Sequence, residues 1–270
     1  MKARSIKGKN AGEIQAALEQ NMADGFLPTL AIAFVSVQIN RTEIRKIFND
    51  TGIVLFGATT NGEFIDETIG TGTAAILLLD IKKDHFKLYF EEYPEGNYRE
   101  VAMDIARKAV AKFQTPAFII SLSHQATDGE AILHGFEEVV GPAVNVFGGC
   151  AGDDYTFSEQ FVFTNDQDSG HAMVCIVLDE EKVTVKGIAT CGWKAIGTEK
   201  TVTKSEGNHV YTVDNIPVLD ITAKYGGIQN VTPDNKALLL EIAANLPLQL
   251  LREKGDPIMR PGLKIDWNDH

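Results

Sequence analysis

Two glycine-rich segments carry most of the side chains that could bind a small molecule. The later one, residues 146–154, reads VFGGCAGDD. Gly148 and Gly149 free the backbone at the end of an apolar run, where amide groups can point at an anionic ligand group. Asp153 and Asp154 supply carboxylates for an ammonium group or a cation. The segment therefore predicts a binding site for a small polar ligand.

An earlier segment repeats this pattern. Residues 55–63 read LFGATTNGE, in which Gly57, Thr59, Thr60 and Glu63 offer glycine, hydroxyl and carboxylate groups in matching places. Glycine-rich turns after strands are also common as plain tight turns, and that interpretation stays open. Neither segment has the GxGxxG or GxxxxGK[ST] spacing of nucleotide-binding loops, so phosphate binding is not favoured.

Three further side chains are candidates for the same site. His124 follows the apolar run FIISLS, where open α/β sheets expose functional groups, although a solvated loop histidine would show the same pattern. Cys150 could be a nucleophile if loop amides lowered its thiol pKa, or a small filler residue. Trp193 could close over a ligand or anchor a core between two modules. Because no GxSxG elbow and no base can be assigned, we predict no catalytic residue.

The sequence does not predict a metal centre. There is no HExxH motif, and Cys150, Cys175 and Cys191 form no CxxC pair. Their odd number leaves one cysteine unpaired in any disulfide scheme, which fits a reducing compartment.

The two glycine-rich segments lie within a longer internal repeat. PTLAIAFVS from Pro28 resembles PAFIISLSH from Pro116, and GTAAILLLD from Gly72 resembles GHAMVCIVLD from Gly170. We interpret this as a duplication of two units, at about 10–95 and 97–190. Two such units packed side by side would enclose a shared site near a pseudo-twofold axis.

Hydrophobic periodicity predicts the same elements in both units. Each opens with an amphipathic helix, over 11–26 and 98–113, followed by a buried strand over 30–35 or 117–122. A second helix covers 41–48 in the first unit, and Asp128 is the predicted N-cap of its counterpart. A strand then leads into each glycine-rich segment, and two alternating strands complete the unit. The expected fold class is α/β (α+β), with α-β-α-β-β-β units forming packed mixed sheets.

The pattern changes after Gly187 to short alternating runs, beginning with VTVKGIATCGWKAIG. Gly207-Asn208 and Asp214-Asn215 mark turns between strands, and Pro217 precedes a short helix to about Tyr225. We expect a first domain over 1–200 and a strand-rich module over 201–270 that looks truncated.

Charge and composition narrow the partners. A formal net charge of −12 and a pI near 5.0 disfavour a nucleic-acid surface, since the chain has no block of lysine and arginine to neutralise phosphates. The N-terminus lacks the apolar core of a signal peptide, and no apolar run reaches the length of a membrane helix. We therefore expect a cytoplasmic protein without nucleic-acid or membrane partners.

Four stretches together resemble the FIST domain, a sensory domain of prokaryotic signalling proteins with relatives in eukaryotic F-box proteins. They are FGATTNGEF at Phe56, VFGGCAGDDYTF at Val146, FVFTN…GHAMVCIVL at Phe161 and CGWKAIGTEKTVTKSEGNHVYTVDNIPVLDI at Cys191. They run in family order over most of the chain. The resemblance implies an N-terminal FIST domain with part of a C-terminal one.

The resemblance implies a sensor of a small ligand, with amino acids or related metabolites proposed for the family. In this chain the Gly148 and Gly149 amides and Thr59 would hold a carboxylate, and Asp153 or Glu63 an amine. A signalling protein, such as a histidine kinase, a cyclase or a chemotaxis-type protein, would read the occupancy. Some relatives bind haem and respond to nitric oxide, for which His124 is the best-exposed candidate ligand. An enzyme using Cys150 or the paired acids is the last alternative.

Overall fold

The computed structural model describes residues 1–66, 68–93, 96–123, 127–156, 158–188, 192–235, 238–253, 257–262 and 264–268. They form two compact units, Met1–Ile188 and Ala189–His270. His124, Gln125 and Ala126 lie outside the described residues, as does Cys191.

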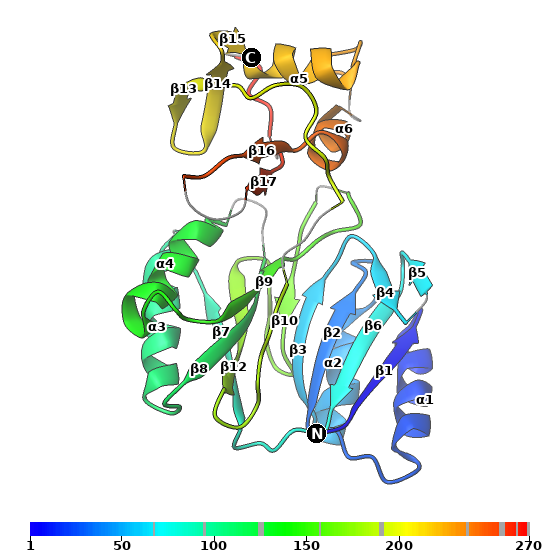
Figure 1. The fold of residues 1–270 in the computed structure, drawn as a ribbon. Coiled ribbons are helices and arrows are strands. Elements are labelled where there is room, and N and C mark those ends of the chain that lie inside the picture. The colour runs from blue at the N-terminus through cyan, green and yellow to red at the C-terminus, as the bar shows by residue number, and fades with distance from the viewer. Residues whose placement is uncertain are drawn as a thin grey trace. The chain divides into compact units, whose positions relative to one another are not determined.

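The first sheet of unit Met1–Ile188 has the strand order β1-β6-β2-β3-β10-β11 (Figure 1). Its strands are β1 (Ala3–Gly8), β2 (Leu30–Val35), β3 (Val54–Thr59), β6 (Ala74–Leu79), β10 (Val162–Phe163) and β11 (Asp168–Ser169). The pair β2–β3 is parallel and every other pair is antiparallel. Helices α1 (Ala11–Met22) and α2 (Arg41–Thr51) cover one face. A short hairpin, β4 (Glu63–Ile65) and β5 (Thr68–Gly70), follows β3.

The second sheet has the order β7-β12-β8-β9. Its strands are β7 (Phe86–Glu92), β8 (Pro116–Leu122), β9 (Val146–Cys150) and β12 (Ala172–Asp179). The pair β8–β9 is parallel, and β12 is antiparallel to both β7 and β8. Helices α3 (Tyr98–Val110) and α4 (Gly129–Val140) pack on one face. Both sheets thus share one order and one set of strand directions, in which β1-β6-β2-β3 corresponds to β7-β12-β8-β9.

By this correspondence, each structural repeat begins with the first strand of its sheet. A strand, β1 or β7, precedes the first helix of each repeat, whereas the sequence ranges 10–95 and 97–190 begin at the helices. β7 therefore belongs to the second sheet, where Phe90 pairs with Val174. In the other direction, β10 comes from the later part of the chain and pairs with β3 of the first sheet. The pairing of β10 with β3 therefore links the later part of the chain to the first sheet.

Local signals explain why the helices begin where they do. The Asn10 side chain accepts a hydrogen bond from Glu13 N, while the Glu13 carboxylate accepts from Lys9 N and from the Asn10 amide. Asn10 is thus the N-cap, and its side chain satisfies an amide group that the helix leaves open, while Glu13 reaches back to the residue before the cap. Asp128 caps α4 as predicted, since its carboxylate accepts from Ala131 N at 2.9 Å.

Three apolar cores hold unit Met1–Ile188 together. One lies between the first sheet and its helices, and a second lies between the second sheet and its helices. A third core joins the facing sides of the two sheets, with Ile32 and Phe56 from the first and Val174 and Ile176 from the second. Because the strands are covered on both faces, their sequences are nearly continuous apolar runs.

Unit Ala189–His270 is rich in short strands, as expected. It contains β13 (Val202–Glu206), β14 (His209–Val213), β15 (Ile216–Pro217), α5 (Val218–Gly226), α6 (Leu238–Asn245), β16 (Leu248–Leu250) and β17 (Ile258–Arg260). The turns at Gly207-Asn208 and Asp214-Asn215 separate β13, β14 and β15, and α5 starts directly after Pro217. Residues 184–188 and 192–196 have no regular secondary structure, although their alternating pattern is typical of strands.

Candidate functional site

A small cavity of about 160 Å³ lies where the two glycine-rich segments meet inside unit Met1–Ile188. Both repeats contribute to it, and its lining comprises Phe34, Phe56, Ala58, Thr59, Thr60, Ile119, Ile120, Ser121, Gly148, Gly149 and Cys150. The structure therefore brings Thr59 and Thr60 together with Gly148, Gly149 and Cys150. Residues of the two segments, which are far apart in the sequence, thus line one cavity.

Backbone hydrogen bonds join the two segments beyond the cavity. Gly152 N donates to Thr59 O at 2.7 Å, and Asp154 N donates to Thr60 O at 3.0 Å. The Asn61 side-chain oxygen accepts from Asp153 N at 2.8 Å. Because each bond crosses from one repeat to the other, the position of Asp154 depends on the first segment.

Two of the predicted glycines are required by packing. Gly57 is buried, and a Cβ there would lie 2.1 Å from the Phe163 ring. Gly148 has φ +150°, and its Cβ would lie 1.9 Å from Ile120 O of the neighbouring strand. Gly149 differs, since a Cβ there would meet no heavy atom within 4 Å.

Among the described residues β9 is the last strand of its sheet, and its outer side presents two backbone amides. Phe118 N donates to Asn145 O, and Ala151 N donates to Leu122 O. In a parallel ladder, alternate residues face the partner strand, so odd-numbered residues of β9 bond to β8. The N–H groups of Gly148 and Cys150 therefore point away from β8, whereas that of Gly149 faces it. The amides available to a ligand are those of Gly148 and Cys150.

Glu63 is held firmly by the protein. Its side chain is almost fully buried, at 4% exposed. One carboxylate oxygen accepts from Thr60 Oγ1 at 2.6 Å, and the other accepts from Thr73 N at 3.1 Å and Thr73 Oγ1 at 2.8 Å. These bonds tie the loop after β3 to the start of β6, so both oxygens already have partners.

Asp153 has a similar role in the second segment. It is 2% exposed, and its Oδ2 accepts from Ser158 N at 2.7 Å and from Gln160 Nε2 at 3.1 Å. The carboxylate thereby fixes the turn that leads back toward β10.

Asp154 differs from both of these acids. Its Oδ2 accepts from Ser36 Oγ at 2.6 Å and from Gln38 Nε2 at 3.3 Å. Its Oδ1 is buried and has no hydrogen-bond partner among the described residues. The residue has φ +55°, in the left-handed region that aspartate tolerates better than most side chains. A buried carboxylate oxygen without a partner is costly, and a bound cation or amine would satisfy it.

Ser36 and Gln38 were missed by the sequence analysis. Aligning the repeats from Pro28 and Pro116 places Ser36 opposite His124. The strand registers instead pair Val35 with Thr59 and Leu122 with Cys150, which makes Ser123 the counterpart of Ser36. Both serines are fully buried at the ends of equivalent strands. The alignment of the two repeats could therefore have pointed to Ser36, but only after a shift of one residue.

The structure contradicts an acidified thiol at Cys150. The residue is partly open to solvent, yet enough protein surrounds the sulfur that burial raises the pKa of the Cys150 thiol above its ordinary value. Nearby Tyr93 donates to Ser123 O at 2.6 Å, and burial likewise raises the pKa of this phenol. A protonated thiol is a poor nucleophile, which favours the interpretation of Cys150 as a small lining residue.

We expect alkylation of Cys150 to show this shift directly. In a Cys191→Ser variant, the iodoacetamide reaction rate at Cys150 should still be rising above pH 8.5, the midpoint of an ordinary thiol. Cys175 is fully buried and should stay unmodified in the folded protein. Mass spectrometry of the labelled peptide, with urea-unfolded protein as the control, gives both profiles. A folded-state midpoint at or below the unfolded one would contradict the structure.

Trp193 belongs to the other unit and is about half exposed. Its proposed closure over a ligand stays a prediction. His124 lies outside the described residues, so its place at the site also stays a prediction. Within the described ranges, no group of three or more His, Cys, Asp or Glu side chains is arranged to hold a metal ion. No helix there is long and apolar enough to cross a membrane.

Comparison with known proteins identifies the family. None of the curated proteins matches the chain significantly. The family model for the FIST N domain matches residues 29–216, which include both glycine-rich segments and every residue that lines the cavity. FIST is a family of sensory domains and not a family of enzymes, which supports a role in sensing a signal. The match covers most of the chain, and the protein therefore belongs to the FIST family.

Proposed function

We propose that this protein is a cytoplasmic sensory domain that binds a small polar metabolite, such as an amino acid, where its two repeats meet. One observation carries the proposal: Asp154 Oδ1 is buried and has no hydrogen-bond partner among the described residues. Asp154 does not itself line the cavity, but its backbone N donates to the carbonyl oxygen of Thr60, which does.

The two ends of an amino acid match the groups that the site offers. The ammonium group would pair with Asp154 Oδ1, a charge-assisted interaction. The carboxylate would accept from the outward N–H groups of Gly148 and Cys150. The Thr59 and Thr60 hydroxyls already donate to Phe161 O and to the Glu63 carboxylate. Glu63 supports its loop in this scheme, because both of its carboxylate oxygens are already engaged. Asp153 supports the second loop through Oδ2, which accepts from Ser158 N and Gln160 Nε2.

The size of the cavity limits the ligand. A volume of about 160 Å³ is roughly that of five liquid-water molecules. It falls below the ~300 Å³ at which drug-sized ligand pockets begin. The cavity therefore favours a small metabolite over a haem, the alternative for which His124 is the candidate ligand. In this proposal a signalling protein, such as a histidine kinase, a cyclase or a chemotaxis-type protein, reads the occupancy.

A thermal-shift screen tests this function. The purified chain is heated with each common amino acid, small amines, small carboxylates and haemin. A ligand at 100 times its dissociation constant adds about 2.7 kcal/mol of stability, which gives a clear shift. We expect one amino-acid class to stabilise the protein and haemin to have no effect.

Replacing Asp154 by asparagine should lower the affinity for the amino acid by about tenfold or more, because the ammonium group loses its charged partner while the side-chain shape remains. Glu159, an exposed acid nearby in the sequence, provides the matched control as Glu159→Gln. Titration calorimetry of the three proteins measures the change. Equal affinities for wild type and Asp154→Asn would remove the proposed role of Asp154, and stabilisation by haemin alone would favour the haem alternative.

A further inference from the structure

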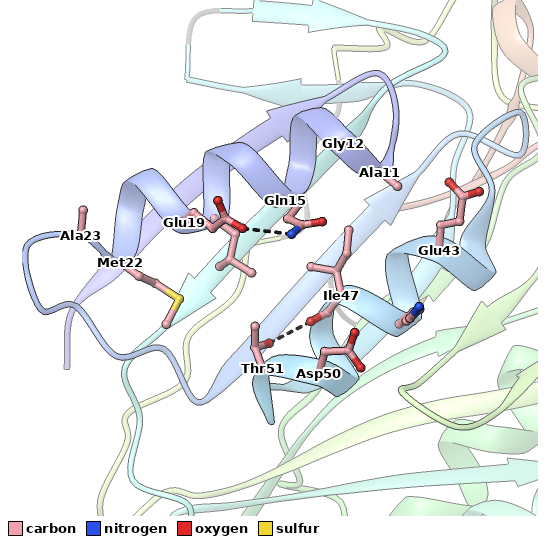
Figure 2. Close-up of a pocket in the computed structure, with 12 residues that line it drawn as sticks. Ala11, Gly12, Gln15, Glu19, Met22, Ala23, Glu43, Ile47, Asp50 and Thr51 are labelled. Atoms are coloured by element: carbon pink, nitrogen blue, oxygen red, sulfur yellow. Dashed lines mark hydrogen bonds between the residues drawn. The ribbon is translucent and has the colours of Figure 1, made fainter.

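A larger groove lies on the opposite side of the first sheet, between helices α1 and α2. It has a volume of about 650 Å³, and Figure 2 shows side chains of both helices along it. The lining residues are Ala11, Gly12, Gln15, Leu18, Glu19, Met22, Ala23, Glu43, Lys46, Ile47, Asp50 and Thr51. Nothing in the cavity between the repeats involves these residues, so the groove is a separate feature.

The equivalent helices of the second repeat are packed closely. Gly135 of α4 lies against α3, where an added Cβ would be 2.5 Å from Arg99 O and 2.7 Å from the Ala102 Cβ. Arg99 also pairs with Glu138 across the two helices. Two helices in the same topology therefore pack closely in the second repeat and leave a groove in the first. The fold itself does not require the groove between α1 and α2.

The groove has an apolar floor and an acidic rim. Leu18, Met22 and Ile47 provide the floor, and each packs on the core beneath the helices. Figure 2 shows Glu19, Glu43 and Asp50 along the groove, and Lys46 is the one cation among the residues that line it. An occupant that complements this surface has an apolar stripe flanked by lysine or arginine.

We propose that this groove is the docking site for a basic amphipathic helix of a signalling partner. A helix fits because its ridges can lie in the groove between two other helices, as in helix-in-groove recognition. α1 has 12 residues and is about 18 Å long, enough to meet anchors at positions i, i+3 or i+4, and i+7. The proposal does not depend on the ligand site. The loop that carries Ser36 and Gln38 leads into α2, so both sites border this helix.

Display libraries of amphipathic helices test the proposal on the full chain. One library has leucine or methionine at the anchor positions and lysine or arginine at the flanks, and its sister library has glutamate at the same flanks. We expect the chain to enrich the basic library and not the acidic one, with binding that weakens as salt is raised. Enrichment of neither library, or of both equally, would overturn the proposal.

Charge reversal in the groove provides the second test. The double variant Glu19→Lys/Asp50→Lys changes two exposed residues near helix C-termini, where lysine is favourable, so the fold is expected to persist. Enriched basic peptides should bind it about tenfold more weakly. The control Glu100→Lys/Glu159→Lys changes the net charge equally at other exposed positions and should bind within twofold of wild type.

The same variants separate the other occupants. If the variant and the control bind the peptide equally, the acidic rim is not recognised and the proposal fails. If the wild-type chain dimerises in sedimentation experiments and the groove variant does not, a second copy of this chain occupies the groove. That outcome also overturns the proposed partner.

Discussion

Replacing Phe163 by alanine is expected to lower the free energy of unfolding by about 3–5 kcal/mol, the usual range for a fully buried phenylalanine. The ring lies in the core between the first sheet and its helices, and it packs directly on Gly57 of the neighbouring strand. Phe163 belongs to β10, so its loss weakens the contact by which the later part of the chain completes the first sheet. Urea unfolding followed by circular dichroism measures the change.

A double-mutant cycle adds a sharper test of this contact. Gly57→Ala should be strongly destabilising in the wild-type background, because its Cβ would lie 2.1 Å from the ring. In the Phe163→Ala background the ring is absent, and the same substitution should cost little. The coupling is expected to exceed about 1 kcal/mol, within the range seen for residues in contact. Additive effects would show that the ring does not pack on Gly57.

Gly148→Ala is expected to destabilise the protein by about 2–5 kcal/mol and to abolish ligand binding at the cavity. Overpacking typically costs about 1–3 kcal/mol, and a strained backbone conformation adds a similar amount. Here the methyl group would lie 1.9 Å from Ile120 O, which is backbone that cannot turn aside, and φ is +150°.

The neighbouring glycine provides the control for this prediction. Gly149→Ala places its methyl group in open space and should change the unfolding free energy by no more than about 1 kcal/mol. Thermal unfolding of both variants gives the comparison. A Gly149→Ala variant as unstable as Gly148→Ala would contradict the backbone geometry of β9.

Much of the local structure could be predicted from the sequence. The buried strands β2 and β8 have near-continuous apolar runs, and the helix start at Asp128 follows from its capping side chain. These features depend on residues close together in the chain. The repeat also predicted that residues 55–63 and 146–154 would share one site. The structure brings Thr59 and Thr60 together with Gly148–Cys150 at one cavity, and the binding of a ligand there stays a prediction.

The partners of individual strands could not be predicted. Alternation along residues 86–92 shows which side chains share a face but not which strand lies beside them. The pairing of β7 with β12 joins Phe90 to Val174, and that of β10 with β3 joins Phe163 to Gly57. Packing between residues far apart in the chain decides both pairings. For this reason the units predicted from the sequence begin at helices, whereas the structural repeats begin at β1 and β7.

The separate roles of the acids were also beyond the sequence. Glu63, Asp153 and Asp154 are alike as residue types, and each follows a glycine-rich turn. Their difference arises from the groups that donate to them. Thr73 and Gln160 follow Glu63 and Asp153 by only ten and seven residues, whereas Ser36 reaches Asp154 from 118 residues away. Only the completed fold shows which carboxylate oxygen has no hydrogen-bond partner among the described residues.

The two ends of each repeat lie side by side. Ala3 at the start of β1 pairs with Leu79 at the end of β6, and Phe86 pairs with Leu178 in the second repeat. A chain whose two ends meet can be joined to a second copy, or cut and rejoined elsewhere, without stretching its sheet. Residues 80–85 are all that separates β6 from β7. The strand order of each four-stranded unit therefore lets one unit follow the other through a short connection, and the pairing of β10 with β3 then joins the two.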